Sequence, residues 1–141
     1  MLSVERMTTL RRWAVVPASA VAAAIVWTVA VPLAGVDLDV KTGGRVQHVG
    51  IGSVIAVSLV VAVLAALVRR AIARATQARA GHGARAWVIL ASVVLLVSLA
   101  GPAGAVTASA GWSLAALHIV VGGLLIVGLR RVHLRTAEPT N

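Results

Sequence analysis

The sequence contains no cysteine, no phenylalanine and no tyrosine. Without Cys, disulfide bonds, thiolate metal sites and thiol redox chemistry are excluded. Asp and Glu together number only 4, and none of them lies in a long apolar run. A small multidrug exporter needs a membrane-embedded carboxylate to exchange protons for cations, so that mechanism is excluded as well. The acidic residues are Glu5, Asp37, Asp39 and Glu138.

Apolar residues are abundant instead. They make up 60% of the 141 residues, charged residues make up 12%, and the mean hydropathy is +0.97. A soluble domain of this size cannot bury so much apolar surface, because too many of its residues must face water. We therefore expect lipid to be the natural solvent of this chain.

Four apolar segments are long enough to cross a bilayer. The first contains 21 uncharged residues, which as a helix span roughly 30 Å, the thickness of the hydrocarbon core. The long uncharged stretch 86–129 is interrupted by Gly101-Pro102-Ala103-Gly104, which predicts a tight turn between two spans. We expect an all-α membrane protein, a single four-transmembrane-helix bundle over 1–141, with spans at about 13–33, 49–68, 87–105 and 112–129. Pro17 would then lie in the first turn of its helix, where a missing N–H disturbs little.

The loop at 34–48 has a different pattern. Val36, Leu38 and Val40 alternate with charged residues, and Gly43-Gly44 follows. Alternation next to a Gly-Gly turn is typical of a β-hairpin. We expect a short extracytoplasmic hairpin between helices 1 and 2, leaning on the helix ends because an isolated hairpin is marginally stable.

The basic residues predict the orientation. Cytoplasmic loops carry an excess of Lys and Arg, so we expect a multi-pass plasma-membrane protein with both termini and the loop 69–86 in the cytoplasm. The first run is too long for a signal-peptide core, so we expect it to remain as a span. Lys41 and Arg45 alone lie on the outer side. The inner basic residues are Arg6, Arg11, Arg12, Arg69, Arg70, Arg74, Arg79, Arg85, Arg130, Arg131 and Arg135.

The central basic loop has no acidic residue. Each Arg near an anionic membrane surface contributes about 1 kcal/mol of attraction. We expect lipid-headgroup contact here, with the helix of the second span continuing into the loop and ending at Gly81-His82-Gly83. The net charge of +9 is explained in this way, and no nucleic-acid partner is expected, because stacking aromatics and binding motifs are missing. The headgroup contacts are assigned to Arg69, Arg70, Arg74, Arg79 and Arg85.

The Trp residues fit the same topology. Trp13 and Trp87 fall at inner boundaries and Trp112 at an outer one, as in an interfacial aromatic belt. Trp27 lies deeper, where packing or lipid contact is expected.

His118 is the ionisable side chain well inside a span. It shares a helix stripe with Gly111, Ala115 and Gly122, so a neighbouring helix can approach closely and the imidazole should face protein. One interpretation is structural, with a hydrogen bond to a backbone carbonyl or a hydroxyl on the next helix. The other is a proton relay or ligand site, because intramembrane ionisable groups are commonly functional. The candidate hydroxyl partners are Thr28, Ser53, Ser58, Ser92 and Thr107.

Asp37, Asp39 and His48 form a candidate site at the outer mouth. Their spacing matches no recognised metal-ligand pattern, and Lys41 and Arg45 beside them favour ion pairing. Haem is not expected, because only His48 could pair with His118 and its depth is wrong. Without a catalytic constellation we expect no enzyme activity, no metal and no cofactor.

Three segments carry a resemblance. They are VAVPLAGVDLDVKTGGRVQHVGIGSV, SLAGPAGAVTASAG and LHIVVGGLLIVGLRR. In combination they resemble an uncharacterised family of small four-span membrane proteins from GC-rich Gram-positive bacteria, catalogued as a domain of unknown function. The resemblance runs from about Arg11 to Arg131. It implies the four-helix architecture and brings no activity, substrate or catalytic residue.

Two functional hypotheses follow. The first is a non-enzymatic plasma-membrane protein, an envelope-associated or accessory subunit, either homo-oligomeric or bound to another membrane protein. The alternative is a small transporter or channel component in which His118 titrates, since His changes charge most readily near neutral pH.

Overall fold

The structure is a computed structural model that describes residues 2–76 and 82–130. Helix α1 continues directly into a π-helical turn, η1, and a two-stranded hairpin precedes α2. A short 3-10 turn, η2, connects α3 and α4. The elements are α1 Leu2–Thr28, η1 Val29–Leu33, β1 Asp39–Thr42, β2 Arg45–His48, α2 Ile51–Ala75, α3 His82–Ser98, η2 Gly101–Gly104 and α4 Ala108–Arg130.

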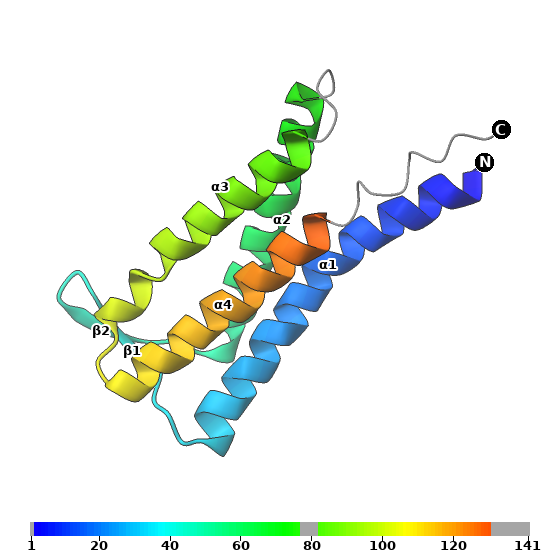
Figure 1. The fold of residues 1–141 in the computed structure, drawn as a ribbon. Coiled ribbons are helices and arrows are strands. Elements are labelled where there is room, and N and C mark those ends of the chain that lie inside the picture. Colours follow the sequence, from blue (N-terminus) through cyan, green and yellow to red (C-terminus); the bar gives the residue numbers. More distant parts are fainter. Residues whose placement is uncertain (1, 77–81, 131–141) are drawn as a thin grey trace.

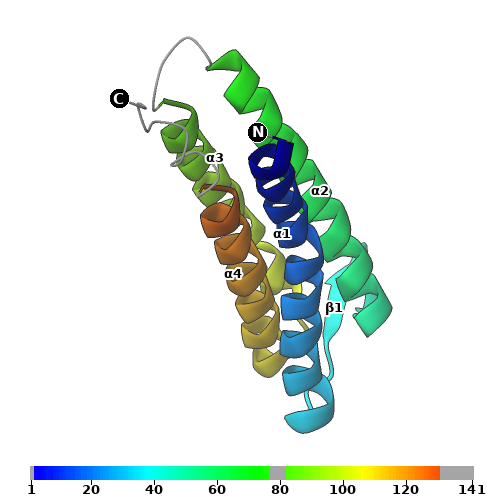
Figure 2. The ribbon, with the colours of Figure 1, turned by 90° about the vertical axis from the view of Figure 1, so that its right-hand side faces the viewer.

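The helices form an elongated bundle (Figures 1 and 2). Helix α1 packs against both α2 and α4, and α3 packs mainly against α4. The hairpin lies at one end, here called the hairpin end. The start of α1, the end of α2, the start of α3 and the end of α4 lie at the other, the basic end (Figure 1).

The prediction of four membrane-competent helices is confirmed for the part of the chain that the structure describes. The qualifying stretches are 13–33, 51–75, 82–104 and 108–130, and only 11–22% of the most apolar window of each is buried inside the protein. The helices therefore present most of their apolar surface outward, which is the arrangement that a lipid solvent favours.

Two sequence expectations about helix ends are wrong. Helix α1 begins at Leu2, so the basic N-terminal segment is helical and Pro17 lies in the helix interior, where it has no N–H to donate to the preceding turn. His82 and Gly83 begin α3, whereas the sequence suggested that they end the preceding helix.

The hairpin between α1 and α2 is present as predicted, with antiparallel pairing from Asp39–His48 to Thr42–Arg45. Gly43 and Gly44 have φ values of 58° and 79°, the left-handed conformation that a two-residue hairpin turn requires. The strand leans on the α3–α4 connection, because the Val106 N–H donates to the Asp39 carbonyl oxygen at 2.9 Å.

A core cluster of buried apolar residues lies at the hairpin end. It joins residues of α1, the hairpin, α2 and α4, and Leu38 next to the hairpin is completely buried within it. Its buried members are Ala23, Leu38, Val54, Ala110, Leu114 and Leu117.

Small residues set the distances between helices. Along α1 the buried positions include Ser19, Ala20 and Ala23, and short side chains permit the close approach that drives helix association in lipid. At the basic end, a Cβ added to Gly128 of α4 would meet Val15 of α1 at 3.0 and 3.1 Å.

We predict that Gly128→Ala destabilises the α1–α4 contact, because the β-branched Val15 is stiff and the helices must separate. Gly123→Ala is the matched control, since its Cβ would meet nothing within 4 Å and both substitutions gain the same helix propensity. Denaturation in mixed micelles should give Gly128→Ala a free energy of unfolding about 1 kcal/mol below that of Gly123→Ala. Equal stabilities would contradict this account of the contact.

Candidate functional site

A cavity of about 780 Å³ lies between α2, α3 and α4 and reaches the hairpin at one end. Its volume is in the range of small-molecule sites, which are usually mostly apolar with a few placed polar groups. The polar lining residues are Gln47, His48, Ser53, Ser58, Trp87, Ser98 and His118.

Helix α3, which lines one side of the cavity, has close contacts with α4 and with the end of α2. Helix α3 approaches α4 closely where a Cβ on Gly122 would meet Leu95 Cδ1 at 2.6 Å. At the basic end α3 also meets α2, since a Cβ on Gly83 would lie 2.5 Å from Thr76 Oγ1. The cavity is lined by residues of α2, α3 and α4 beside these contacts.

The cavity is open along the α2–α3 side. The lining residues Val57 of α2 and Val94 of α3 are 61% and 58% exposed. Apolar side chains that line a cavity and also face the surroundings form a groove, which a molecule can enter sideways from the membrane.

His118 lines the cavity and is half-buried. Its Nδ1 lies 2.7 Å from the Leu114 carbonyl oxygen of its own helix. Because a carbonyl only accepts, Nδ1 carries the proton, and in the neutral ring Nε2 is left as the acceptor. The partner expected on the next helix is therefore replaced by one on α4 itself. The predicted close packing of its stripe does occur at Gly122, against Leu95.

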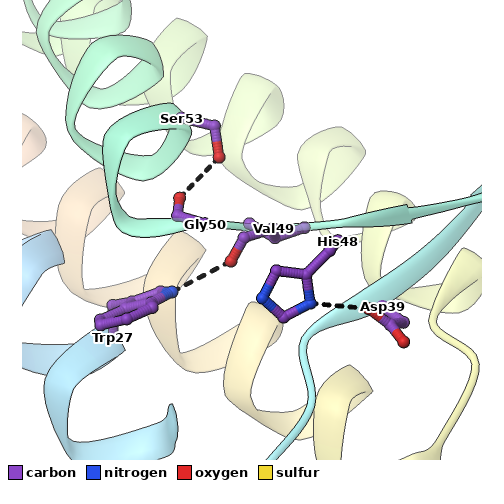
Figure 3. Close-up of polar contacts among 6 residues, drawn as sticks. All are labelled: Trp27, Asp39, His48, Val49, Gly50 and Ser53. Atoms are coloured by element: carbon purple, nitrogen blue, oxygen red, sulfur yellow. Dashed lines mark hydrogen bonds and ion pairs between the residues drawn. The ribbon is translucent and has the colours of Figure 1, made fainter. Parts of the chain in front are cut away.

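At the hairpin end the structure joins two of the three residues assigned to the outer mouth. His48 Nδ1 and Asp39 Oδ1 are 2.9 Å apart, across a directly paired position of the hairpin (Figure 3). Asp37 is exposed and precedes the strand. Within 2–76 and 82–130, no three His, Asp or Glu side chains are grouped as metal ligands.

His48 also lines the cavity. The hairpin lies at the end of the bundle and contributes His48 to the lining there, whereas His118 of α4 contributes to the same lining from within the bundle. The hairpin is held there by Trp27 of α1, whose Nε1 donates to the carbonyl oxygen of Val49 at 3.0 Å (Figure 3).

At the basic end, Arg70, Arg74 and Arg85 are exposed, whereas Arg69 is only 7% exposed. Arg69 follows the buried α2 positions Val54, Ser58 and Ala62 at spacings of four, four and seven, which continue one helix face. Its assignment to headgroup contact therefore does not fit its burial. Arg79 lies outside the described residues.

Trp87 does not lie at the surface of the bundle, where the sequence predicts it. It was expected in an interfacial belt but is 3% exposed and lines the cavity. Its Nε1 is buried without a hydrogen-bond acceptor among the described residues. A signal existed in the spacing, because Trp87 shares a helix face with Leu90, Ala91 and Val94. Trp112, by contrast, is 78% exposed.

Comparison with known proteins identifies a family and no function. The model of DUF6069, a family of unknown function, matches residues 4–135. No curated protein and no solved structure matches the chain.

We predict that Trp27→Phe loosens the hairpin, because the Val49 carbonyl loses its indole donor while the ring packing is largely kept. The free energy of unfolding should fall by about 1 kcal/mol. Trp112→Phe makes the same chemical change at an exposed position and should leave stability nearly unchanged. Thermal unfolding in detergent compares the two, and an equal effect would show that the Trp27 hydrogen bond does not hold the hairpin.

Proposed function

The chain belongs to DUF6069, a family of unknown function, and we propose that it is a small non-enzymatic plasma-membrane protein that holds a lipid-soluble molecule between α2, α3 and α4. The single observation that carries this proposal is the cavity of about 780 Å³, which is lined mainly by apolar side chains and opens along α2 and α3. A site of this kind selects ligands by apolar shape and a small number of hydrogen bonds.

The proposed orientation places both termini and the basic end in the cytoplasm, with the hairpin outside. Its support is the asymmetry of charge, because residues 69–85, at the end of α2, in the connection and at the start of α3, carry five Arg, whereas the hairpin side carries two basic residues beside two Asp. Excess Lys and Arg mark cytoplasmic loops.

A non-enzymatic role is proposed from the chemistry of the lining. The lining residues of the cavity include Ser and His but no Asp or Glu. A serine nucleophile needs an imidazole within hydrogen-bond reach as its base, whereas the hydroxyls of Ser53 and Ser98 donate to backbone carbonyl oxygens and the hydrogen bond of His118 goes to the Leu114 carbonyl oxygen. We therefore propose an accessory protein that keeps a membrane-soluble molecule available to a membrane-protein partner or to a second copy of itself.

We predict that filling the cavity abolishes binding of lipid-soluble molecules. Ala91→Phe places a ring in the lining, whereas Val93→Phe enlarges an exposed neighbour on α3 that is not in the lining. Thermal shifts of the purified protein with a panel of quinones, fatty acids and phospholipids should appear in the wild type and in Val93→Phe and vanish in Ala91→Phe. No shift with any compound, or equal shifts in both variants, would overturn the proposal.

A second candidate, a small transporter or channel component, is favoured by the position of His118. Its imidazole lines a cavity that also reaches His48 at the hairpin end. An ionisable ring in such a place is a means of coupling proton movement to a ligand.

His118→Leu separates the two candidates. The Leu114 carbonyl oxygen also accepts the backbone hydrogen bond of the helix. Removing the imidazole therefore leaves that oxygen with a partner and should change the melting temperature little. In liposomes containing a pH-sensitive dye, a holding protein should show no proton flux, and the variant should behave like the wild type. Wild-type flux that His118→Leu eliminates, with folding intact, would establish the transporter instead.

A further inference from the structure

We propose that the cavity recognises its lipid-soluble occupant by a hydroxyl group, which donates to Nε2 of His118 and accepts from the hydroxyl of Ser58. This inference rests on the proposed function and names the chemical class of the ligand, an uncharged lipophilic alcohol or phenol. Apolar shape alone admits any lipid-soluble molecule of suitable size, whereas these two polar groups select a molecule that carries a hydrogen-bond donor at their depth.

The first argument is the hydrogen bonding of His118. Its Nδ1–H donates to the Leu114 carbonyl oxygen at 2.7 Å, so Nε2 of the neutral ring is an acceptor. Within 2–76 and 82–130, no second hydrogen bond of this imidazole is found. Nε2 is not among the fully buried atoms that lack a partner, so it keeps accessible surface, and His118 lines the cavity. The cavity therefore presents an acceptor to whatever occupies it.

The second argument is the hydroxyl of Ser58, a residue that is 7% exposed and lines the cavity. Helical hydroxyls commonly donate to a carbonyl oxygen of the preceding turn, as those of Ser53 and Ser98 do in the same lining. The Ser58 hydroxyl makes no such bond among the described residues, and its oxygen is not fully buried. The protein thus leaves a second polar group for an occupant.

The third argument is that Ser58 and His118, here called the polar pair, lie at a similar level. Helices α2 and α4 contact each other and run in the same direction, from the hairpin end to the basic end (Figure 1). Val54 of α2 and Leu114 of α4 belong to one buried cluster. Ser58 and His118 follow them by four residues, about 6 Å along the same helix faces. The polar pair therefore lies one turn beyond this cluster, on two neighbouring helices.

A hydroxyl is the group that satisfies both members of the polar pair, because its single oxygen donates one hydrogen bond and accepts others. A ketone, a quinone or an ether can accept from Ser58 but offers no hydrogen to Nε2. A carboxylate has no donor either. A site with a buried polar group rejects an analogue that leaves this group unpaired.

The rest of the lining suits the apolar body of such a ligand. Toward the basic end, the lining residues of α2 between Val61 and Val68 and of α4 between Val121 and Ile126 are all apolar. From Ser58 to Val68 the lining covers about 15 Å by helical rise, which is the hydrocarbon depth of about one leaflet. A long alkyl chain or an extended ring system therefore fits beside the polar pair.

Binding of matched compounds to the purified full-length protein tests the inference. Dodecanol and nonylphenol carry a hydroxyl, whereas dodecyl methyl ether and nonylanisole keep the oxygen and lose the donor. Radiolabelled compounds are bound to immobilised protein in detergent at about pH 8, where an ordinary imidazole is neutral. Retention by Ala91→Phe is subtracted, because it measures partition into the micelle. We expect a hydroxyl compound to bind about tenfold more tightly than its methyl ether.

Two variants separate the roles within the polar pair. His118→Leu removes the acceptor, so it should weaken binding of the hydroxyl compound about tenfold and leave its methyl ether unweakened. Ser58→Ala removes a donor that both compounds can use, so it should weaken both by a similar factor, about fivefold. Ser92→Ala is the control, since it removes a helix hydroxyl outside the lining, and it should change neither. If a variant fails to fold, the wild-type ratio of hydroxyl compound to ether still decides.

The outcomes distinguish this inference from the proposed function. Equal binding of hydroxyl compounds and their ethers above the Ala91→Phe background leaves the cavity function standing and overturns the hydroxyl assignment, as does a His118→Leu protein that keeps the preference. A polar pair occupied only by water would also give equal binding. If neither these compounds nor the quinones, fatty acids and phospholipids bind above that background, the proposed function fails as well. A preference confined to one pair of compounds identifies the hydroxyl as phenolic or aliphatic.

Discussion

The close packing of α1 against both α2 and α4 is the interaction on which the rest of the bundle depends. In lipid the helices gain little from burying apolar side chains, so short side chains that permit van der Waals contact decide which helices meet. Ser19, Ala20 and Ala23 of α1 are buried, and Gly128 of α4 lies against Val15. With α1 occupied on two sides, α3 can pack only on α4 and on the end of α2. The cavity is the space that this arrangement leaves.

Length, hydropathy and turn chemistry made much of the fold predictable. The four apolar runs and the Gly101–Gly104 break correspond to described elements, and Gly43-Gly44 forms the hairpin turn. These features are encoded locally, since a charge-free run of sufficient length or a left-handed residue pair has few alternatives. The interior position of Pro17 shows the limit, because a basic segment can be helical without being apolar.

The candidate site was less predictable for a physical reason. A membrane helix is apolar on all sides, so its sequence gives little information about which face meets protein and which meets lipid. Trp87 and Arg69 both look like boundary residues, and both turn inward. His118 is recognisable in the sequence as an ionisable residue within an apolar run. Its hydrogen bond to the Leu114 carbonyl oxygen depends on the side-chain rotamer, which residue spacing does not predict. The presence of His48 in the same cavity lining as His118 depends on how the hairpin folds over the bundle.

The contact between the hairpin and the α3–α4 connection has a mechanical consequence. Because Asp39 in the α1–α2 connection binds Val106 in the α3–α4 connection, the two helix pairs are tied together at the hairpin end. At the opposite end, Gly83 against Thr76 draws α2 and α3 together. Contacts at both ends of the bundle thus hold α2 and α3, and these contacts limit how closely the two helices approach each other at mid-length. The groove between them can stay open without an occupant to prop it apart.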